Sequence, residues 1–224
     1  MKRRIALYGG TFDPVHLGHL SVAEKLLELF ALDEVLFIPA TLAPHKRSRD
    51  VTSAWHRYAM LALATEHDER LRVSSVELDA PEKPYTVETL SRLQSEMKES
   101  ARLFLVMGAD SWREIQTWRE WRRVLEMSDH IVVTRPGYEL DAAHVGEEFQ
   151  SRVIDLRGAS SERILNEVEK SAGEKIFVTD AVVKDVSSTQ VRQLARRGRA
   201  RELAKLVPPS VADYIEKYRL YREA

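Results

Sequence analysis

The stretch RIALYGGTFDPVHLGHL, residues 4–20, decides the fold, because it joins a short apolar run to a glycine-rich turn and the start of a helix. Residues 4–9 are apolar enough to form a buried strand, and residues 19–30 repeat apolar side chains at helical spacing. Gly9 and Gly10 end the strand, where glycine permits unusual backbone angles and lets a ligand approach the backbone closely. The stretch therefore predicts a strand–turn–helix unit whose turn can admit a ligand.

The same alternation of apolar runs and helical patterns continues along the chain. We expect strands at 4–9, 34–39, 71–78, 102–108, 130–137 and 175–180, and helices at 19–30, 52–67, 86–100, 161–171, 188–198 and 210–221, with a tryptophan-rich helical stretch up to about Met127. Continuous apolar strands joined by helices are typical of a parallel sheet that is covered on both faces. The sequence therefore predicts a doubly wound, mainly parallel α/β fold (Rossmann-like), with ligands at the C-terminal ends of the strands.

The length of 224 residues suggests a single domain, residues 1–224, with a small C-terminal helical portion from about residue 187. The segment from Tyr138 to Gly173 is polar and charged, and contains one expected helix. We interpret this segment as an insertion or a lid.

Composition limits the classes of function. With 34 basic and 35 acidic residues the formal net charge is −1, which argues against binding of nucleic acid or an anionic membrane through bulk charge. The absence of cysteine excludes disulfides and thiolate catalysis, and the sequence shows neither a signal peptide nor a membrane span, so we expect a cytoplasmic protein. The basic run at 192–206 raises RNA binding as an alternative, but near-neutral overall charge favours a solvated helix face.

Two histidines three residues apart, His16 and His19, follow the glycine-rich turn. At a helix start they lie on one face of the first turn, beside unpaired N–H groups and the positive end of the helix dipole. This combination predicts an anion site, and phosphate is its natural ligand. Zinc is the alternative, with Asp13 as a third ligand, but zinc does not explain the glycines. The glycine fingerprint of dinucleotide-binding proteins and the P-loop motif are both absent.

A second helix start lies near the other end of the chain, in DVSSTQVRQL, residues 185–194. Ser187 and Gln190 have the spacing of a capping box, so Ser187 is expected to cap the helix. The N–H groups and hydroxyls of Ser188 and Thr189 then face outward, and Arg192 lies one turn further on. Two such helix starts in one α/β domain predict that a polyphosphate is held between them.

These residues carry a resemblance. The stretch GGTFDPVHLGHL (9–20), with His16-x-Gly18-His19, and the stretch VSSTQVR (186–192) resemble the nucleotidyltransferase superfamily with the HxGH motif. Further stretches resemble one branch, the bacterial nicotinate-nucleotide adenylyltransferases: APHK (43–46) followed by Arg57 and Met60, PYTVETL (84–90), GAD (108–110), WREW (118–121), RPG (135–137) and VPPSVADYI (207–215). The similarity covers most of the chain, in the right order.

The resemblance implies that ATP and nicotinate mononucleotide give deamido-NAD and pyrophosphate, with no protein nucleophile. His16 and His19 would then be catalytic and contact the ATP phosphates, and an ordinary histidine pKa of about 6.5 lets both rings be cationic there. The other residues expected to bind ATP are Gly9, Gly10, Thr11, Phe12, Ser188, Thr189 and Arg192. Mg²⁺ is expected on the triphosphate, with no protein ligand assigned.

The resemblance also implies a site for the mononucleotide. Lys46 is a candidate for its phosphate and Asp110 for ribose hydroxyls. Thr86, expected to cap a helix, and Trp118 are candidates for the nicotinate ring and its carboxylate. The residue after this tryptophan is often aromatic in the family but is Arg119 here. Two alternatives stay open: an adenylyl- or cytidylyltransferase for another phosphate acceptor, and a non-catalytic nucleotide sensor.

Overall fold

The computed structural model describes residues 2–41, 51–97, 100–135, 137, 140–171, 173–181, 184 and 186–222. Its backbone forms two compact units. The first comprises Met1–Tyr8, Lys25–Leu36 and Pro84–Val182, and the second comprises Gly9–Glu24, Phe37–Lys83 and Val183–Ala224. The organisation of residues 1–224 as one domain stays a prediction.

The strands form one seven-stranded sheet, in the order β3-β2-β1-β4-β5-β7-β6. They are β1 (Arg3–Gly10), β2 (Glu34–Pro39), β3 (Leu71–Val73), β4 (Ala101–Gly108), β5 (Asp129–Val133), β6 (Val153–Asp155) and β7 (Ile176–Thr179). The pairs β1–β4, β4–β5, β5–β7 and β6–β7 all run parallel. The predicted α/β fold with a mainly parallel sheet is confirmed.

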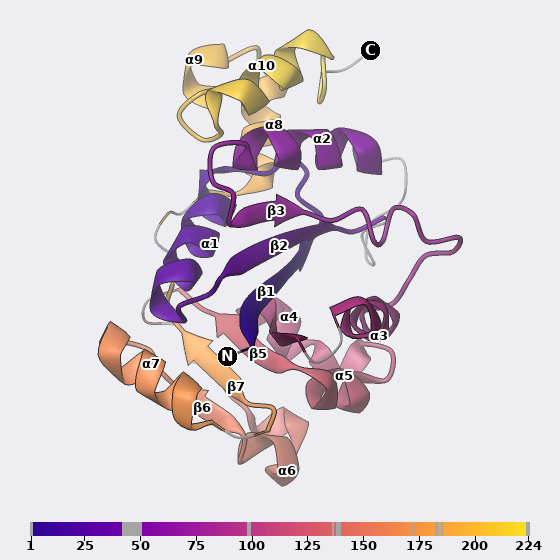
Figure 1. The fold of residues 1–224 in the computed structure, drawn as a ribbon. Helices are drawn as coiled ribbons and strands as arrows, with labels where there is room; N and C mark the ends of the chain where they lie inside the picture. The colour runs from indigo at the N-terminus through magenta and orange to yellow at the C-terminus, as the bar shows by residue number, and fades with distance from the viewer. Residues whose placement is uncertain are drawn as a thin grey trace. The chain divides into compact units, whose positions relative to one another are not determined.

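In the first unit, helices pack on both sides of the strands because the strands are apolar on both faces. Every residue of β5 and β7 is buried, and the rings of Phe30, Phe104 and Phe177 meet with centroid distances of 5.7–6.4 Å. Figure 1 shows α7 (Ser161–Lys170) on one side of these strands, and α3 (Thr86–Met97) and α5 (Trp121–Met127) on the other. Right-handed crossovers of β-α-β units in opposite directions along a sheet produce this arrangement.

The polar segment 138–173 is not an insertion, and that interpretation is wrong. Its described part holds a short 3₁₀ helix (Ala143–Val145), α6 (Glu147–Gln150), strand β6 and α7. Strand β6 forms the edge of the sheet, with Ile154 beside Phe177 of β7. An edge strand of three partly exposed residues carries little apolar signal, which explains why the sequence pattern did not reveal it.

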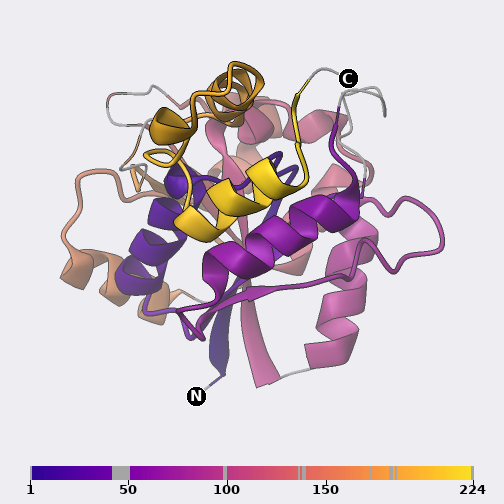
Figure 2. The same ribbon diagram turned by 90° about the horizontal axis from the view of Figure 1, so that it is seen from above.

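The second unit contains the start of α1 (Leu17–Leu29), then α2 (Ala54–Thr65) and β3, and ends with α8 (Ser188–Arg196), α9 (Ala200–Leu203) and α10 (Pro209–Lys217). Helices α2 and α10 lie side by side (Figure 2), joined by a hydrogen bond of 3.1 Å from the Ser210 hydroxyl to the Leu63 carbonyl. The expected strand 71–78 ends at Val73, because the hydroxyl of Ser74 accepts the N–H of Val76 and turns the chain.

Candidate active site

Gly10 and Phe12 shape the turn after β1. Phe12 has φ +47° and is buried, and its ring lies edge-on to Phe37 at 5.6 Å and to His19 at 5.0 Å. A Cβ atom on Gly10 would lie 2.9 Å from Cζ of Phe12, so glycine is needed there. A Cβ atom on Gly9 would meet no atom of the described residues within 4 Å. The backbone at Gly9 therefore borders open space, as the expected approach of a nucleotide requires.

The spacing His-x-Gly-His has a local physical reason. Helix α1 begins at Leu17, and the carbonyl of His16 accepts the N–H groups of His19 and Leu20, so His16 is the N-cap residue. In return, Nδ1 of His19 accepts the backbone N–H of His16 at 3.3 Å, the reciprocal bond of a capping box. A Cβ atom on Gly18 would lie 3.0 Å from the His16 ring and 3.2 Å from the Lys184 carbonyl. Glycine between the histidines therefore leaves space for the His16 ring.

The two imidazoles stack, with ring centroids 3.7 Å apart and planes inclined by 22°. Burial lowers the pKa of His16 to about 4, and burial together with repulsion from His16 holds the pKa of His19 well below 6.5. Both rings are therefore neutral at pH 7 without ligand. The expectation that they can be cationic beside phosphates stays a prediction. Since Nδ1 of His19 is an acceptor, its proton is on Nε2, and Nδ1 of His16 is buried without a hydrogen-bond partner among the described residues.

Asp13 fixes the backbone just before the histidines. Its side chain is 2% exposed, and Oδ1 accepts the hydroxyl of Tyr221 at 2.8 Å while Oδ2 accepts the N–H of Thr52 at 3.4 Å. The peptide bond between Asp13 and Pro14 is cis. Because the carboxylate of Asp13 is engaged by these two donors, it serves the loop rather than a zinc ion shared with the histidines.

Arg57 lies beside the glycine-rich turn. The sequence patterns gave it no role, and it was named only as part of the resemblance. It is 1% exposed on α2, and its guanidinium donates to the carbonyls of Thr11 at 2.6 Å, Ala40 at 2.6 Å and Thr52 at 2.9 Å. It therefore braces the glycine-rich turn and both ends of the chain that flank residues 42–50. The sequence held one indication of this role: Arg57 lies on the same helix face as the buried Met60. A buried charge needs hydrogen-bond partners, so an arginine on a buried face predicts contacts with other parts of the chain.

The start of α8 contacts the turn directly. Ser187 caps the helix as predicted, accepting the N–H of Gln190 at 3.2 Å. The hydroxyl of Ser188 donates to the carbonyl of Pro14 at 3.0 Å, and Nη1 of Arg192 donates to the carbonyl of Asp13 at 2.6 Å. The hydroxyl of Thr189 accepts Nη2 of Arg192 at 3.1 Å. The two predicted phosphate-binding helix starts therefore meet within the second unit.

The residues expected to bind the mononucleotide lie in the first unit, except Lys46, which is outside the described residues. Asp110 follows β4 in α4 (Ala109–Arg113), with an exposed carboxylate 3.7 Å from Arg113. Trp118 is half-buried and ends a 3₁₀ turn at Ile115–Thr117. The nearby Trp112 is fully buried, as an ordinary core residue is.

Thr86 does not cap α3, which corrects our expectation. The carbonyl of Tyr85 accepts the N–H groups of Glu88 and Thr89, so Tyr85 is the N-cap and Thr86 is the first helical residue. The carboxylate of Glu88 accepts the N–H of Tyr85 at 2.9 Å. Tyr85 and Glu88 thus have the spacing and the reciprocal bond of a capping box, one position before the expected cap. Thr86, at the first helical position, keeps a backbone N–H that needs no intrahelical partner.

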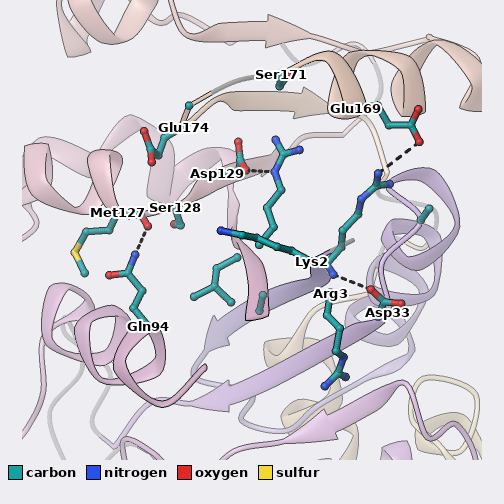
Figure 3. Close-up of a pocket in the computed structure, with 16 residues that line it drawn as sticks. Lys2, Arg3, Asp33, Gln94, Met127, Ser128, Asp129, Glu169, Ser171 and Glu174 are labelled. Atoms are coloured by element: carbon teal, nitrogen blue, oxygen red, sulfur yellow. Dashed lines mark hydrogen bonds and ion pairs between the residues drawn. The ribbon is translucent and has the colours of Figure 1, made fainter. Parts of the chain in front are cut away.

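A separate hollow of about 1070 Å³ opens in the first unit at the N-terminal ends of β1, β4 and β5 (Figure 3). Four of its charged side chains form ion pairs with one another: Arg102 pairs with Asp129 at 2.6 Å, and Arg4 pairs with Glu169 at 3.5 Å. Ligands of doubly wound sheets bind at the opposite, C-terminal ends of the strands. We therefore do not assign the active site to this hollow.

Among the described residues, no three histidine, aspartate or glutamate side chains gather into a group that would hold a metal ion. No helix in the described part of the chain has both the length and the apolar content needed to cross a bilayer.

The parallel sheet and the glycine-rich HxGH turn define a nucleotidyltransferase of the cytidylyltransferase-like class, and the model of that family matches residues 7–194. A "Probable nicotinate-nucleotide adenylyltransferase" of Thermoanaerobacter sp. is 36% identical over 220 residues, covering 98% of this chain and 95% of the relative. One from Desulfatibacillum aliphaticivorans is 35% identical, with 97% and 99% covered. The chain therefore belongs to the nicotinate-nucleotide adenylyltransferase branch of the cytidylyltransferase-like family.

Among solved structures, the chain is similar in fold to Plasmodium falciparum nicotinic acid mononucleotide adenylyltransferase complexed with NaAD. The TM-score is 0.71 at 20% identity, covering 98% of this chain and 97% of that one. The same enzyme complexed with APC gives a TM-score of 0.70 at 19% identity, with 98% and 97% covered. At this identity the likeness concerns the fold.

Proposed function

We propose that this chain transfers AMP from ATP to nicotinate mononucleotide, forming deamido-NAD and releasing pyrophosphate. The observation that carries the proposal is the contact between the start of α8 and the HxGH turn, made by Ser188 to Pro14 and by Arg192 to Asp13. It brings two helix starts, each a natural anion site, into one unit. The near full-length similarity to relatives with this name supports the same substrates.

The chemistry is an in-line displacement at phosphorus. A 5′-phosphate oxygen of nicotinate mononucleotide attacks the α-phosphorus of ATP, and the bond from that phosphorus to the bridging β-phosphate oxygen breaks. The electron pair leaves with pyrophosphate. The attacking oxygen is already anionic at neutral pH, so the protein needs to supply position and charge stabilisation rather than a base.

We assign the charge stabilisation to His16 and His19. Because Nδ1 of His19 accepts the capping bond, Nε2 carries the proton that we assign to a phosphate oxygen. The buried Nδ1 of His16, which has no partner among the described residues, is a second polar atom that a ligand or a proton can engage. A triphosphate beside the stacked rings favours their charged forms, opposing the burial that lowers each pKa. Proton uptake on ATP binding is the consequence.

The remaining ATP contacts divide between backbone and side chains. The backbone from Gly9 through Gly10 and Thr11 to Phe12 is assigned to the ribose and α-phosphate. The β- and γ-phosphates are assigned to the start of α8. Because the hydroxyl of Ser188 is bonded to Pro14, its backbone N–H is the donor we expect there, together with that of Thr189 and the side chain of Arg192.

For the mononucleotide, we assign its phosphate to Lys46, its ribose to Asp110, its ring to Trp118 and its carboxylate to the first N–H groups and hydroxyl of α3 at Thr86. A carboxylate only accepts hydrogen bonds, and these groups donate, whereas the amino group of a carboxamide would face donors. This arrangement favours the acid over the amide.

The class uses a divalent metal with the nucleotide phosphates, and we propose Mg²⁺. The ion would take its ligands mainly from phosphate oxygens and water, as Mg²⁺ does at nucleotide sites. When bound, the ion neutralises charge on the leaving pyrophosphate. The residues of the protein position the two substrates.

The test is product formation with purified protein, ATP, Mg²⁺ and nicotinate mononucleotide, following deamido-NAD and pyrophosphate by chromatography. Equal molar amounts of the two products support the proposal. Parallel reactions with nicotinamide mononucleotide, phosphopantetheine and CTP test the alternative transferases. Nucleotide binding without product from any acceptor would instead support a sensor and overturn the proposal.

A further inference from the structure

Arg119 and Tyr85 join two segments of the first unit. The guanidinium carbon of Arg119 lies 4.7 Å from the ring centroid of Tyr85, within the range of a cation–π contact. Arg119 directly follows Trp118, and Tyr85 directly precedes Thr86. The contact therefore ties the segment that carries the proposed ring-binding residue to the helix start that carries the proposed carboxylate-binding residue.

The other partners of Arg119 are weak. Its nitrogens lie 4.0 Å from Oε1 of Glu88 and 4.0 Å from Oε1 of Glu120, at the limit of an ion pair. All three side chains are about half exposed, and exposed ion pairs at that distance contribute little. Stacking on Tyr85 is therefore the interaction that fixes the position of Arg119.

The two sides of this contact differ in rigidity. Tyr85 is the N-cap of α3, bonded through its carbonyl to Glu88 and Thr89 and through its N–H to the Glu88 carboxylate. On the other side, Glu120 has φ +50° and ψ +40°, a left-handed conformation that a non-glycine residue keeps only when its surroundings hold it. Tyr85, whose backbone is bonded at the helix start, thus contacts the chain at Trp118–Glu120 through the stacking of its ring with Arg119.

We propose that Arg119 is a positioning residue for the pyridine mononucleotide: by stacking on Tyr85 it holds Trp118 in place at the start of α3. This inference rests on the proposed function. It adds a residue that determines affinity for the acceptor, whose aromatic ring bears a carboxylate. Arg119 acts through Tyr85 and Trp118 rather than on the reacting phosphorus. Its loss therefore changes acceptor binding and leaves the chemical step and ATP binding unchanged.

The test compares steady-state kinetics of Arg119→Ala, Tyr85→Ala and the double variant with the unaltered protein. Each single change should raise KM for nicotinate mononucleotide about fivefold, a factor that corresponds to the loss of one exposed cation–π contact. The value of kcat and KM for ATP should stay the same. If Arg119 acts through Tyr85, the double variant has the KM of the single variants, and Arg119→Lys restores part of the affinity.

Arg122→Ala is the matched control. Its guanidinium lies 4.6 Å from the ring centroid of Trp121, so it makes the same kind of contact in the same unit without touching the neighbours of Thr86 or Trp118. This variant should keep all kinetic constants.

The outcomes separate the two proposals. Absence of deamido-NAD from the unaltered protein would overturn the proposed function. An active protein in which Arg119→Ala keeps its KM for the acceptor would overturn the inference alone. The inference would also fail if the two single effects multiplied in the double variant, or if Arg119→Ala lowered kcat and thermal stability as a general defect.

Discussion

The hydroxyl of Tyr221 donates a hydrogen bond of 2.8 Å to Oδ1 of Asp13, joining positions 208 residues apart in the sequence. Both partners belong to the second unit, and Asp13 is buried just before the HxGH turn. Arg192 binds the carbonyl of the same aspartate at 2.6 Å. The C-terminal end of the described chain and α8 therefore both bind one residue that directly precedes the HxGH turn.

Tyr221→Phe should loosen that turn. It leaves one oxygen of a buried carboxylate without its donor, which destabilises the protein by about 1–3 kcal/mol. Because the turn carries His16 and His19, kcat should fall more than KM for ATP rises. Urea unfolding and steady-state kinetics measure both effects. Tyr218→Phe removes a hydroxyl from a side chain that is 48% exposed, and should change neither; equal effects of the two variants would contradict this role of Tyr221.

His19→Ala should lower kcat strongly and affect ATP binding far less. The variant loses the Nε2 donor at the reacting phosphate and the acceptor for the N–H of His16. Removal of one preorganised donor of this kind costs on the order of 10²–10³ in kcat. Single-turnover rates and ATP titrations measure the two quantities. His67→Ala, at a side chain that is 93% exposed, is the control, and an unchanged kcat in His19→Ala would show that the assignment is wrong.

Gly9→Ala and Gly18→Ala should differ in their effects on thermal stability and on the kinetic constants. At Gly18 the new methyl group meets the His16 ring at 3.0 Å and the Lys184 carbonyl at 3.2 Å, so thermal stability and kcat should both fall. At Gly9 the methyl group meets none of the described residues within 4 Å, so stability should stay the same while KM for ATP rises. Thermal melting and ATP kinetics distinguish the two. A stable, fully active Gly18→Ala would contradict the packing argument.

Stability should fall as the pH falls from about 6.5 towards 4, because buried histidines resist protonation. Burial lowers the pKa of His130 to about 4, with a smaller opposing contribution from the Ser128 backbone, so the unfolded chain binds this proton more readily. The stability that His130 contributes is complete above the unfolded pKa of about 6.5, is lost as the pH falls towards 4, and changes little further below that.

Urea unfolding at pH 7 and pH 5 tests this dependence. In the unaltered protein His130 alone contributes a loss on the order of 2 kcal/mol between these pH values. His130→Leu replaces the imidazole in β5 with an apolar side chain of similar size that does not titrate. This variant should reduce the loss of unfolding free energy by that amount. The same pH dependence with and without His130 would assign the effect to other groups, among them His16 and His19.

The sequence predicted what depends on local pattern. Continuous apolar runs gave the parallel sheet, and the spacing of His16 and His19 after glycines gave the anion-binding turn. It could not predict contacts that only the folded chain creates, such as Tyr221 with Asp13 or Arg57 with four backbone carbonyls. Nor could the sequence predict that the pKa values of His16 and His19 are lowered, because burial, the main cause, is a property of the fold.

The start of α3 shows how a small error in register changes a site. The sequence placed Thr86 at the N-cap, whereas Tyr85 occupies that position and Glu88 bonds to its N–H at 2.9 Å. Threonine is a favoured N-cap residue and tyrosine is not, so residue preference alone selected Thr86, although the exact first residue of a helix is not fixed by such preferences. The shift leaves Thr86 at the first helical position and brings a carboxylate into the first turn.

The unaltered protein should prefer nicotinate mononucleotide to its amide, because donors at the start of α3 match a carboxylate and leave a carboxamide mispaired. Mismatches of this type can reach on the order of 10⁴ in kcat/KM. Thr86→Val removes one hydroxyl donor with little change of shape and should reduce the preference about tenfold. Side-by-side kcat/KM values for the two acceptors give the measurement. Ser91→Ala removes a hydroxyl from the same helix, where it is bonded to the Val87 carbonyl, and should preserve the preference. Equal kcat/KM for acid and amide in the unaltered protein would overturn the assignment of the carboxylate to Thr86.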